Sequence, residues 1–248
     1  MRNSKVPEVT LAFWLIKIAA TTLGETGGDA LSMTLHLGYA VSSLIFVAFL
    51  VVTAAAQIRA RKFHPFLYWA VIVATTTAGT TMADFADRSL GIGYVGGSLI
   101  LFVLLMGVLV LWRFTMVSVA VDNISAPGVE AFYWATILFS NTLGTALGDF
   151  LADSGGLGFE GGALVFGAAL VLVAGAYYFT RISRTLLFWS AFILTRPLGA
   201  TLGDLLTKPH AMGGLHLSRI GSSSWLALFM LACLLLMPQR AAVRAQRP

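Results

Sequence analysis

Four aspartates recur at a fixed distance from tryptophans in this chain. A Trp preceded by another aromatic residue is followed by Gly ten residues later and by Asp five residues after that Gly. The four copies are Trp14, Gly24 and Asp29; Trp69, Gly79 and Asp84; Trp134, Gly144 and Asp149; and Trp189, Gly199 and Asp204. Carboxylates and nearby hydroxyls are ligands of hard cations such as Mg²⁺, Ca²⁺ and Mn²⁺, so the repeated motif could bind a metal ion or a proton.

One copy carries an additional carboxylate. Glu25 stands where the other copies have Thr80, Thr145 and Ala200, which makes it the best single candidate for a functional acid. The candidate ion-binding or proton-binding set is Glu25, Asp29, Asp84, Asp149, Asp204, Asn141, Thr22, Thr77 and Thr142, and its five carboxylates are the candidate metal ligands. In an alternative interpretation, each Asp only caps or tethers the turn into the next helix.

Arg196 is the matching departure in the fourth copy, where the other copies have Thr21, Thr76 and Asn141. A cationic side chain inside a membrane span needs an anionic partner, and we expect Glu25 or one of the aspartates to provide it. Two interpretations stay open: an ion pair that locks two repeats together, or an internal counter-charge that substrate or protons displace. Pro197 follows directly and should kink or loosen this helix.

Glycines in the same segments form small-xxx-small patterns, which allow membrane helices to approach closely. The candidate packing positions are Gly24, Gly28, Gly79, Gly144, Gly148, Gly199 and Gly203. Tight packing of the four motif-bearing helices around a common axis would also bring their aspartates together. Gathered like charges repel, so protons or a bound cation would have to relieve them.

The composition excludes a water-soluble globule. Of the 248 residues, 58% are hydrophobic and only 11% are charged, whereas soluble proteins carry about 25% charged residues. One cysteine excludes a disulfide scaffold, and the sparse charge excludes a nucleic-acid partner. The lipid bilayer is therefore the expected partner of most of the surface.

Eight apolar stretches are long enough to cross a bilayer as helices, which predicts an all-α polytopic membrane protein. They cover residues 9–30, 37–56, 65–86, 92–112, 129–150, 159–179, 185–206 and 218–237. The whole chain, 1–248, is expected to be a single transmembrane domain of four two-helix repeats at about 9–56, 65–112, 129–179 and 185–237. Each repeat returns to its starting side, so the repeats are parallel and related by pseudo-fourfold or pseudo-twofold symmetry. The second half follows the first at an offset of 120 positions.

The distribution of basic residues predicts the orientation. Eleven of the sixteen Lys and Arg residues lie at the termini or between repeats. The positive-inside rule then places both termini in the cytoplasm and the protein in a bacterial inner membrane. Lys17 lies inside the first span and is expected to extend its amine toward the interface, while the four motif tryptophans are expected to be interfacial anchors.

The four copies resemble bacterial multi-pass proteins described as membrane-anchored and built from tandem repeats of unknown function. The resemblance covers nearly the whole chain and implies a topology but no activity. A fainter resemblance relates Gly24–Asp29 to the Glu-x-Gly-Asp signature of calcium and manganese exporters, with one additional Gly here.

These observations favour a membrane transporter or channel for a small cation, with a divalent ion such as Mn²⁺, Ca²⁺ or Mg²⁺ preferred and proton coupling as an option. The cation would be its bound ligand, and homo-oligomerisation stays open. A second hypothesis is a membrane scaffold or accessory subunit whose Gly, Thr and Asp motifs only pack helices. A third is a carrier of a small organic solute. Enzyme motifs are not found in the sequence, so no catalytic residue is expected.

Overall fold

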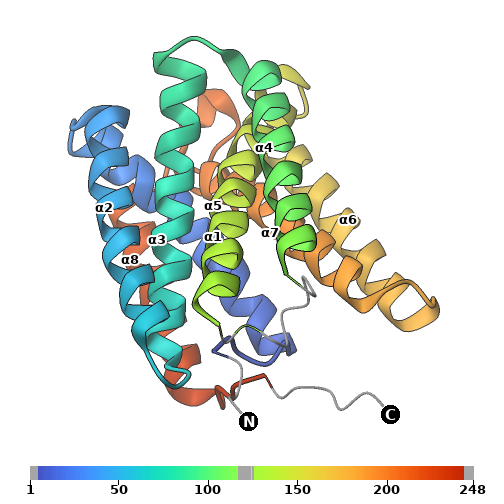
Figure 1. Cartoon of the computed structure of the whole chain (residues 1–248). Coiled ribbons are helices and arrows are strands. Elements are labelled where there is room, and N and C mark those ends of the chain that lie inside the picture. The colour runs from blue at the N-terminus through green and yellow to red at the C-terminus, as the bar shows by residue number, and fades with distance from the viewer. Residues whose placement is uncertain (1–4, 117–123, 125, 243–248) are drawn as a thin grey trace.

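The computed structural model describes residues 5–116, 124 and 126–242, and within them the fold is all-α, as predicted (Figure 1). The long helices are α1 (Leu11–Asp29), α2 (Gly38–Arg59), α3 (Pro65–Asp84), α4 (Gly93–Thr115), α5 (Pro127–Asp149), α6 (Gly158–Phe179), α7 (Arg184–Thr207) and α8 (Arg219–Leu236). Their bounds lie within a few residues of the predicted spans. The only β interaction in the described residues is a bridge between Pro7 and Ala241, which joins the segment before α1 to the segment after α8.

Six of these helices have the length and hydropathy to cross a membrane: α2, α3 with its following turn, α4, α6, α7 and α8. The two other long helices, α1 and α5, have 19 and 23 residues and bury many polar side chains. By contrast, large apolar side chains are exposed along α2, α4, α6 and α8. Exposed apolar surface on this scale is typical of a protein that faces lipid.

Helices α1, α3, α5 and α7 form a closed inner ring in which each helix packs against two neighbours. The other four helices lie outside this ring: α2 packs against α3, α4 against α5, α6 against α7, and α8 against α1. Each outer helix therefore packs mainly on the inner helix of the next repeat, and the fourth repeat closes onto the first. Figure 1 shows α2 beside α3, and α6 beside α7.

The motif glycines lie where successive inner helices touch. A Cβ at each of four equivalent glycines would overlap or crowd the next helix of the ring: Gly24 against Thr76, Gly79 against Asn141 and Thr142, Gly144 against Arg196, and Gly199 against Thr21. A second set one turn further along behaves in the same way, with Gly28 against Thr80, Gly148 against Ala200, and Gly203 against Glu25. The repeated glycine thus permits the same close helix contact four times around the ring.

The chain widens its helical turn directly after the motif aspartate in the first three repeats. Each inner helix continues there as a short π-helical turn: η1 (Ala30–Thr34), η2 (Phe85–Ser89) and η4 (Phe150–Ser154). In the fourth repeat α7 instead ends at Thr207 and leads into the 3₁₀ turn η5 (His210–Met212). These π-helical turns have no counterpart among the expectations from hydropathy, which predict one continuous span in each case.

Three of the four motif tryptophans are not the interfacial anchors that the sequence suggested, whereas Trp14 is half-buried. Trp69, Trp134 and Trp189 are buried, and they pack with Tyr68 and Tyr133 in an aromatic cluster at the end of the ring where the inner helices begin. The two tyrosine hydroxyls are 2.6 Å apart and share a hydrogen bond. Aromatic packing between inner helices therefore closes this end of the ring.

Candidate cation site in the inner ring

Along each inner helix, positions four residues apart lie on nearly the same face. Equivalent residues of the four inner helices therefore form layers inside the ring, one layer for each helical turn. All members of these layers are buried. From the aromatic end they are Lys17, Ile72, Ile137 and Phe192; then Thr21, Thr76, Asn141 and Arg196; then Glu25, Thr80, Thr145 and Ala200; and finally Asp29, Asp84, Asp149 and Asp204. The polarity of the interior thus rises from the aromatic end toward the aspartates.

Two basic side chains link the four aspartates in pairs. Lys208 Nζ lies 3.0 Å from Asp29 Oδ2 and 3.1 Å from Asp204 Oδ1. Arg88 Nε lies 3.0 Å from Asp84 Oδ1, and its Nη2 lies 3.1 Å from Asp149 Oδ2. We call these arrangements the Lys208 clamp and the Arg88 clamp. Each clamp joins one half of the chain to the other, because the first crosses from α7 to α1 and the second from α3 to α5.

The clamp residues were not recognised in the sequence, although a signal was present there. Each follows the aspartate of its own repeat by four residues, and the two positions differ by the 120-residue offset between the halves. Burial lowers the pKa of Lys208, but Asp204 and Asp29 outweigh this and hold the pKa well above its ordinary value. Lys208 is therefore a charged member of its clamp.

Arg196 belongs to the layer of Thr21, Thr76 and Asn141, and its guanidinium extends into the layer that contains Glu25. Its Nη2 donates to Glu25 Oε2 at 2.9 Å and also to the hydroxyls of Thr80 and Thr145. It thereby contacts the inner helices α1, α3 and α5 from α7. Glu25 is one of the partners that we expected for this arginine, and α7 continues as a helix through Pro197. Arg196 Nε and Nη1 are buried without a hydrogen-bond partner in the described part of the chain.

Three carboxylates meet at the contact between α1 and α3. Glu25, Asp29 and Asp84 are buried and each offers an oxygen within 4.8 Å of the other two; we call them the acidic triad. Asp29 Oδ1 is buried and has no hydrogen-bond partner among residues 5–116, 124 and 126–242. Three oxygen ligands at this separation suit a hard cation, which could draw its remaining ligands from water or backbone carbonyls.

The charges of this network do not balance. Its ion pairs involve Glu25 and the four aspartates on one side, and Arg88, Arg196, Lys208 and Arg219 on the other. Arg219 is the most distant partner, with its Nε 3.5 Å from Asp29 Oδ2. One carboxylate therefore exceeds the number of cations in the network, which favours binding of a further positive charge.

The other candidate oxygen donors are not brought to the carboxylates. The hydroxyls of Thr22, Thr77 and Thr142 each bond a backbone carbonyl four residues earlier in their own helix. Asn141 donates to the Thr75 hydroxyl. The hydroxyls that do contact Glu25 or Arg196 belong to Thr80 and Thr145. Thr80 and Thr145 occupy the same position in their repeats as Glu25 does in the first. This shared position could have identified them as neighbours of Glu25 from the sequence.

Lys17 departs from expectation as well. It is completely buried, and its Nζ lies 4.1 Å from the centre of the Phe192 ring instead of reaching the interface. The amine has no hydrogen-bond partner in the described residues. The side chain is instead enclosed at the contact between α1 and α7, where its amine faces Phe192.

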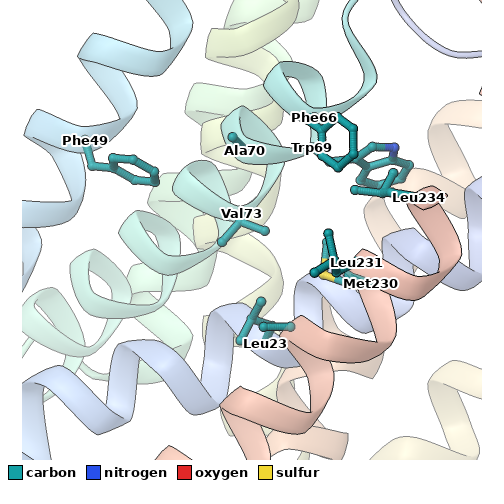
Figure 2. A pocket seen from close by; sticks show the side chains of 10 residues that line it. Leu23, Phe49, Phe66, Trp69, Ala70, Val73, Met230, Leu231 and Leu234 are labelled. Atoms are coloured by element: carbon teal, nitrogen blue, oxygen red, sulfur yellow. The ribbon is translucent and has the colours of Figure 1, made fainter.

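Two apolar cavities lie outside the ring, and neither is lined by a carboxylate. The first, about 290 Å³, lies between α2, α3 and α8, and Figure 2 shows Phe49, Val73 and Leu231 along it. The second, about 310 Å³, lies between α4 and α5 and includes Leu99 and Leu147. Both have apolar linings.

Comparison with known proteins identifies a family but no activity. No curated protein and no solved structure matches the chain. The family described as Repeat of Unknown Function (DUF347) matches it four times, at residues 12–63, 67–118, 132–183 and 187–238. These matches cover most of the chain and confirm the four tandem repeats read from the sequence. The chain therefore belongs to the DUF347 repeat family.

Proposed function

We propose that this protein is a membrane transporter or channel for a small cation, with a divalent ion preferred and the acidic triad as the binding site. In this proposal all eight long helices span a bacterial inner membrane, and the inner ring is pseudo-fourfold. Both termini face the cytoplasm, so the aspartate layer lies toward the outer side. The supporting observation is the convergence of Glu25, Asp29 and Asp84 within 4.8 Å, with one buried oxygen of Asp29 unpaired.

Arg196 supplies the internal counter-charge in this proposal. Its guanidinium neutralises Glu25 at 2.9 Å while the site holds no cation. An arriving cation competes with Arg196 for the same carboxylate, and the hydroxyls of Thr80 and Thr145 continue to bind the displaced guanidinium. Competition of this kind lowers the cost of keeping a carboxylate buried between transport events, since an unpaired buried charge is strongly unfavourable.

Cation flux into proteoliposomes tests the proposal. We expect wild-type protein to carry at least one of Mn²⁺, Ca²⁺, Mg²⁺, Na⁺, K⁺ or H⁺, and Glu25→Gln to abolish that flux. Glu160→Gln is the matched control, because Glu160 is an exposed carboxylate in the first turn of α6, near the same end of the bundle. Flux that survives in Glu25→Gln, or wild-type vesicles that carry none of these ions, would reject the proposal.

A scaffold or accessory subunit is the second candidate, favoured by one specific observation. Every carboxylate of the network has a basic partner within 3.5 Å. The hydroxyls of Thr21 and Thr76 also bond carbonyls of neighbouring inner helices. If the network only holds the helices together, Glu25→Gln will lower the thermal stability. In that case no added cation will change the thermal stability of the wild-type protein. A carrier of an organic solute is the third hypothesis, and the apolar cavities offer such a solute few polar contacts.

A further inference from the structure

Lys17 is a titratable group that the proposed cation site does not use. Its side chain is completely buried in the layer that it shares with Ile72, Ile137 and Phe192. Its Nζ faces the Phe192 ring at 4.1 Å, and no hydrogen-bond acceptor within the described residues contacts it. Ammonium groups in protein interiors are normally paired, because removing an unpaired charge from water is very costly.

The groups around Lys17 do not supply a counter-ion. From α7, Arg196 lies in the next layer and adds a like charge. On the other side, Tyr68 from α3 and Tyr133 from α5 are buried and bonded to each other. Helix α8, the third neighbour of α1, carries Arg219, which pairs with Asp29, and the thiol Cys233. On α1 itself, Glu25 is engaged by Arg196.

We propose that Lys17 is a proton-binding site: the buried side chain is held as a neutral amine and takes up a proton when the ring opens. Binding adds one proton to the amine lone pair and produces the ammonium form, with no other bond made or broken. The face of the Phe192 ring can receive an N–H group of either form of the amine, and the lack of any acceptor for Nζ in the described residues is what favours the neutral form.

This site would supply the coupling proton of the transporter, a role that rests on the proposed function. Lys17 and Glu25 lie on the same helix, with Arg196 from α7 between their layers. When a cation neutralises Glu25, the guanidinium loses its partner, and a neutral Lys17 can accept a hydrogen bond from it. Protonation of Lys17 would instead repel Arg196 toward Glu25 and so favour cation release. Cation binding and protonation of Lys17 are then mutually exclusive.

Nitrogen NMR of the lysine side chains tests the protonation state directly in the intact protein. The chain has only three other lysines, Lys5, Lys62 and Lys208, and the resonance lost in Lys17→Met assigns the fourth. In ¹⁵Nζ-lysine-labelled protein in lipid nanodiscs, we expect Lys17 to be uncharged at neutral pH while the other three are charged. A Lys17 resonance that stays charged at neutral pH would overturn the proposal.

The pH dependence of stability gives a second test that does not require an assigned spectrum. A neutral buried lysine is protonated on unfolding, so the unfolded state binds more protons and wild-type stability must rise with pH. Lys17→Met should therefore be the more stable protein at neutral pH. Its advantage in the unfolding equilibrium constant should shrink by about tenfold per pH unit toward pH ~10, the ordinary titration range of lysine. A variant that is less stable than wild type at all pH values would contradict the proposal.

The two proposals can fail separately. If Lys17 is uncharged but the protein carries no cation, the proton site stands and the proposed transport function falls. If cation flux is measured but Lys17 is charged at neutral pH, transport stands and the proton site is rejected.

Discussion

The contact between α1 and α3 and the contact between α5 and α7 occupy equivalent places in the two halves, 120 residues apart, yet they differ in charge. The first holds Glu25, Asp29 and Asp84, whereas the second holds Thr145, Asp149 and Asp204 at the same positions. The comparison shows that the aspartates belong to the repeated framework. The additional carboxylate is what distinguishes one contact from the other.

Arg196 is a second departure from the symmetry of the repeats, and its positive charge compensates the additional negative charge of Glu25. Arg196 replaces the residue that is Thr76 in the equivalent repeat of the first half, and its guanidinium pairs with Glu25. By contrast, the clamps keep the symmetry, because Arg88 and Lys208 are equivalent and each bridges two aspartates. The two symmetric clamps therefore accompany the asymmetric pair of Arg196 and Glu25, and that pair is where we place the function.

The largest expected effect comes from removing one member of the asymmetric pair. Arg196→Met leaves Glu25 buried without its cation and should lower the free energy of unfolding by about 3–5 kcal/mol. The double variant Glu25→Thr with Arg196→Thr restores residue types found in other repeats and should recover most of this loss. Denaturant unfolding in detergent micelles measures both. A double variant as unstable as Arg196→Met would show that the two residues do not act as a pair.

Breaking the Lys208 clamp should have the next largest effect. Lys208→Met leaves Asp29 and Asp204 without their shared cation and should cost about 3 kcal/mol at neutral pH, because the pair is buried. The deficit should decrease on acidification, since protonation removes the repulsion between the two carboxylates. Thermal unfolding over a pH series measures this. A deficit that does not change with pH would argue against the electrostatic role of the clamp.

Substitution of a ring glycine by alanine should destabilise the protein less than the loss of Arg196 or Lys208. A Cβ at Gly144 would overlap the Arg196 side chain and approach Pro197 Cδ at 3.0 Å, so Gly144→Ala should cost about 1–3 kcal/mol. A Cβ added at Gly167, on the outer helix α6, would have no neighbouring atom within 4 Å. Gly167→Ala is therefore the control that should not be destabilised. Equal unfolding midpoints for the two variants would contradict the packing role of the ring glycines.

The Arg88 clamp should be the weaker of the two. The Arg88 side chain is 30% exposed, compared with 6% for Lys208, so solvent screens its ion pairs with Asp84 and Asp149. We expect Arg88→Met to cost about 1 kcal/mol, near the upper limit for exposed pairs. Raising the salt concentration should reduce the difference from wild type, and a loss as large as that of Lys208→Met would show that the clamps are energetically equivalent.

Hydropathy and the repeated motif were sufficient to predict the helices and the four repeats. The predicted span 65–86 corresponds to α3, Pro65–Asp84, because a polar turn bounds each apolar run. The packing partners could not be predicted in the same way. Hydropathy indicates that α2 and α8 face lipid. It does not indicate that α2 packs on α3 or that α8 packs on α1, which are helices of other repeats.

Within the site, the pairing of Arg196 with a carboxylate was foreseeable, since a membrane interior leaves few alternatives for a guanidinium. The burial of Lys17 was not, because it depends on which helix covers α1, and that information lies in contacts between distant repeats. The hydroxyl ligands were assigned to Thr22, Thr77 and Thr142, but in the described residues these hydroxyls bond only backbone carbonyls of their own helices. Thr80 and Thr145, one turn further along their helices, face Arg196.

Thermal unfolding of the purified protein with Mn²⁺, Ca²⁺, Mg²⁺, Na⁺ and K⁺ tests the central claim most directly, because a ligand that binds only the folded state raises its apparent stability. We predict that at least one of these cations raises the unfolding temperature of wild type and of Glu160→Gln, and that it has no such effect on Glu25→Gln. An equal increase in Glu25→Gln, or no increase in wild type with any cation, would contradict a cation site at Glu25, Asp29 and Asp84.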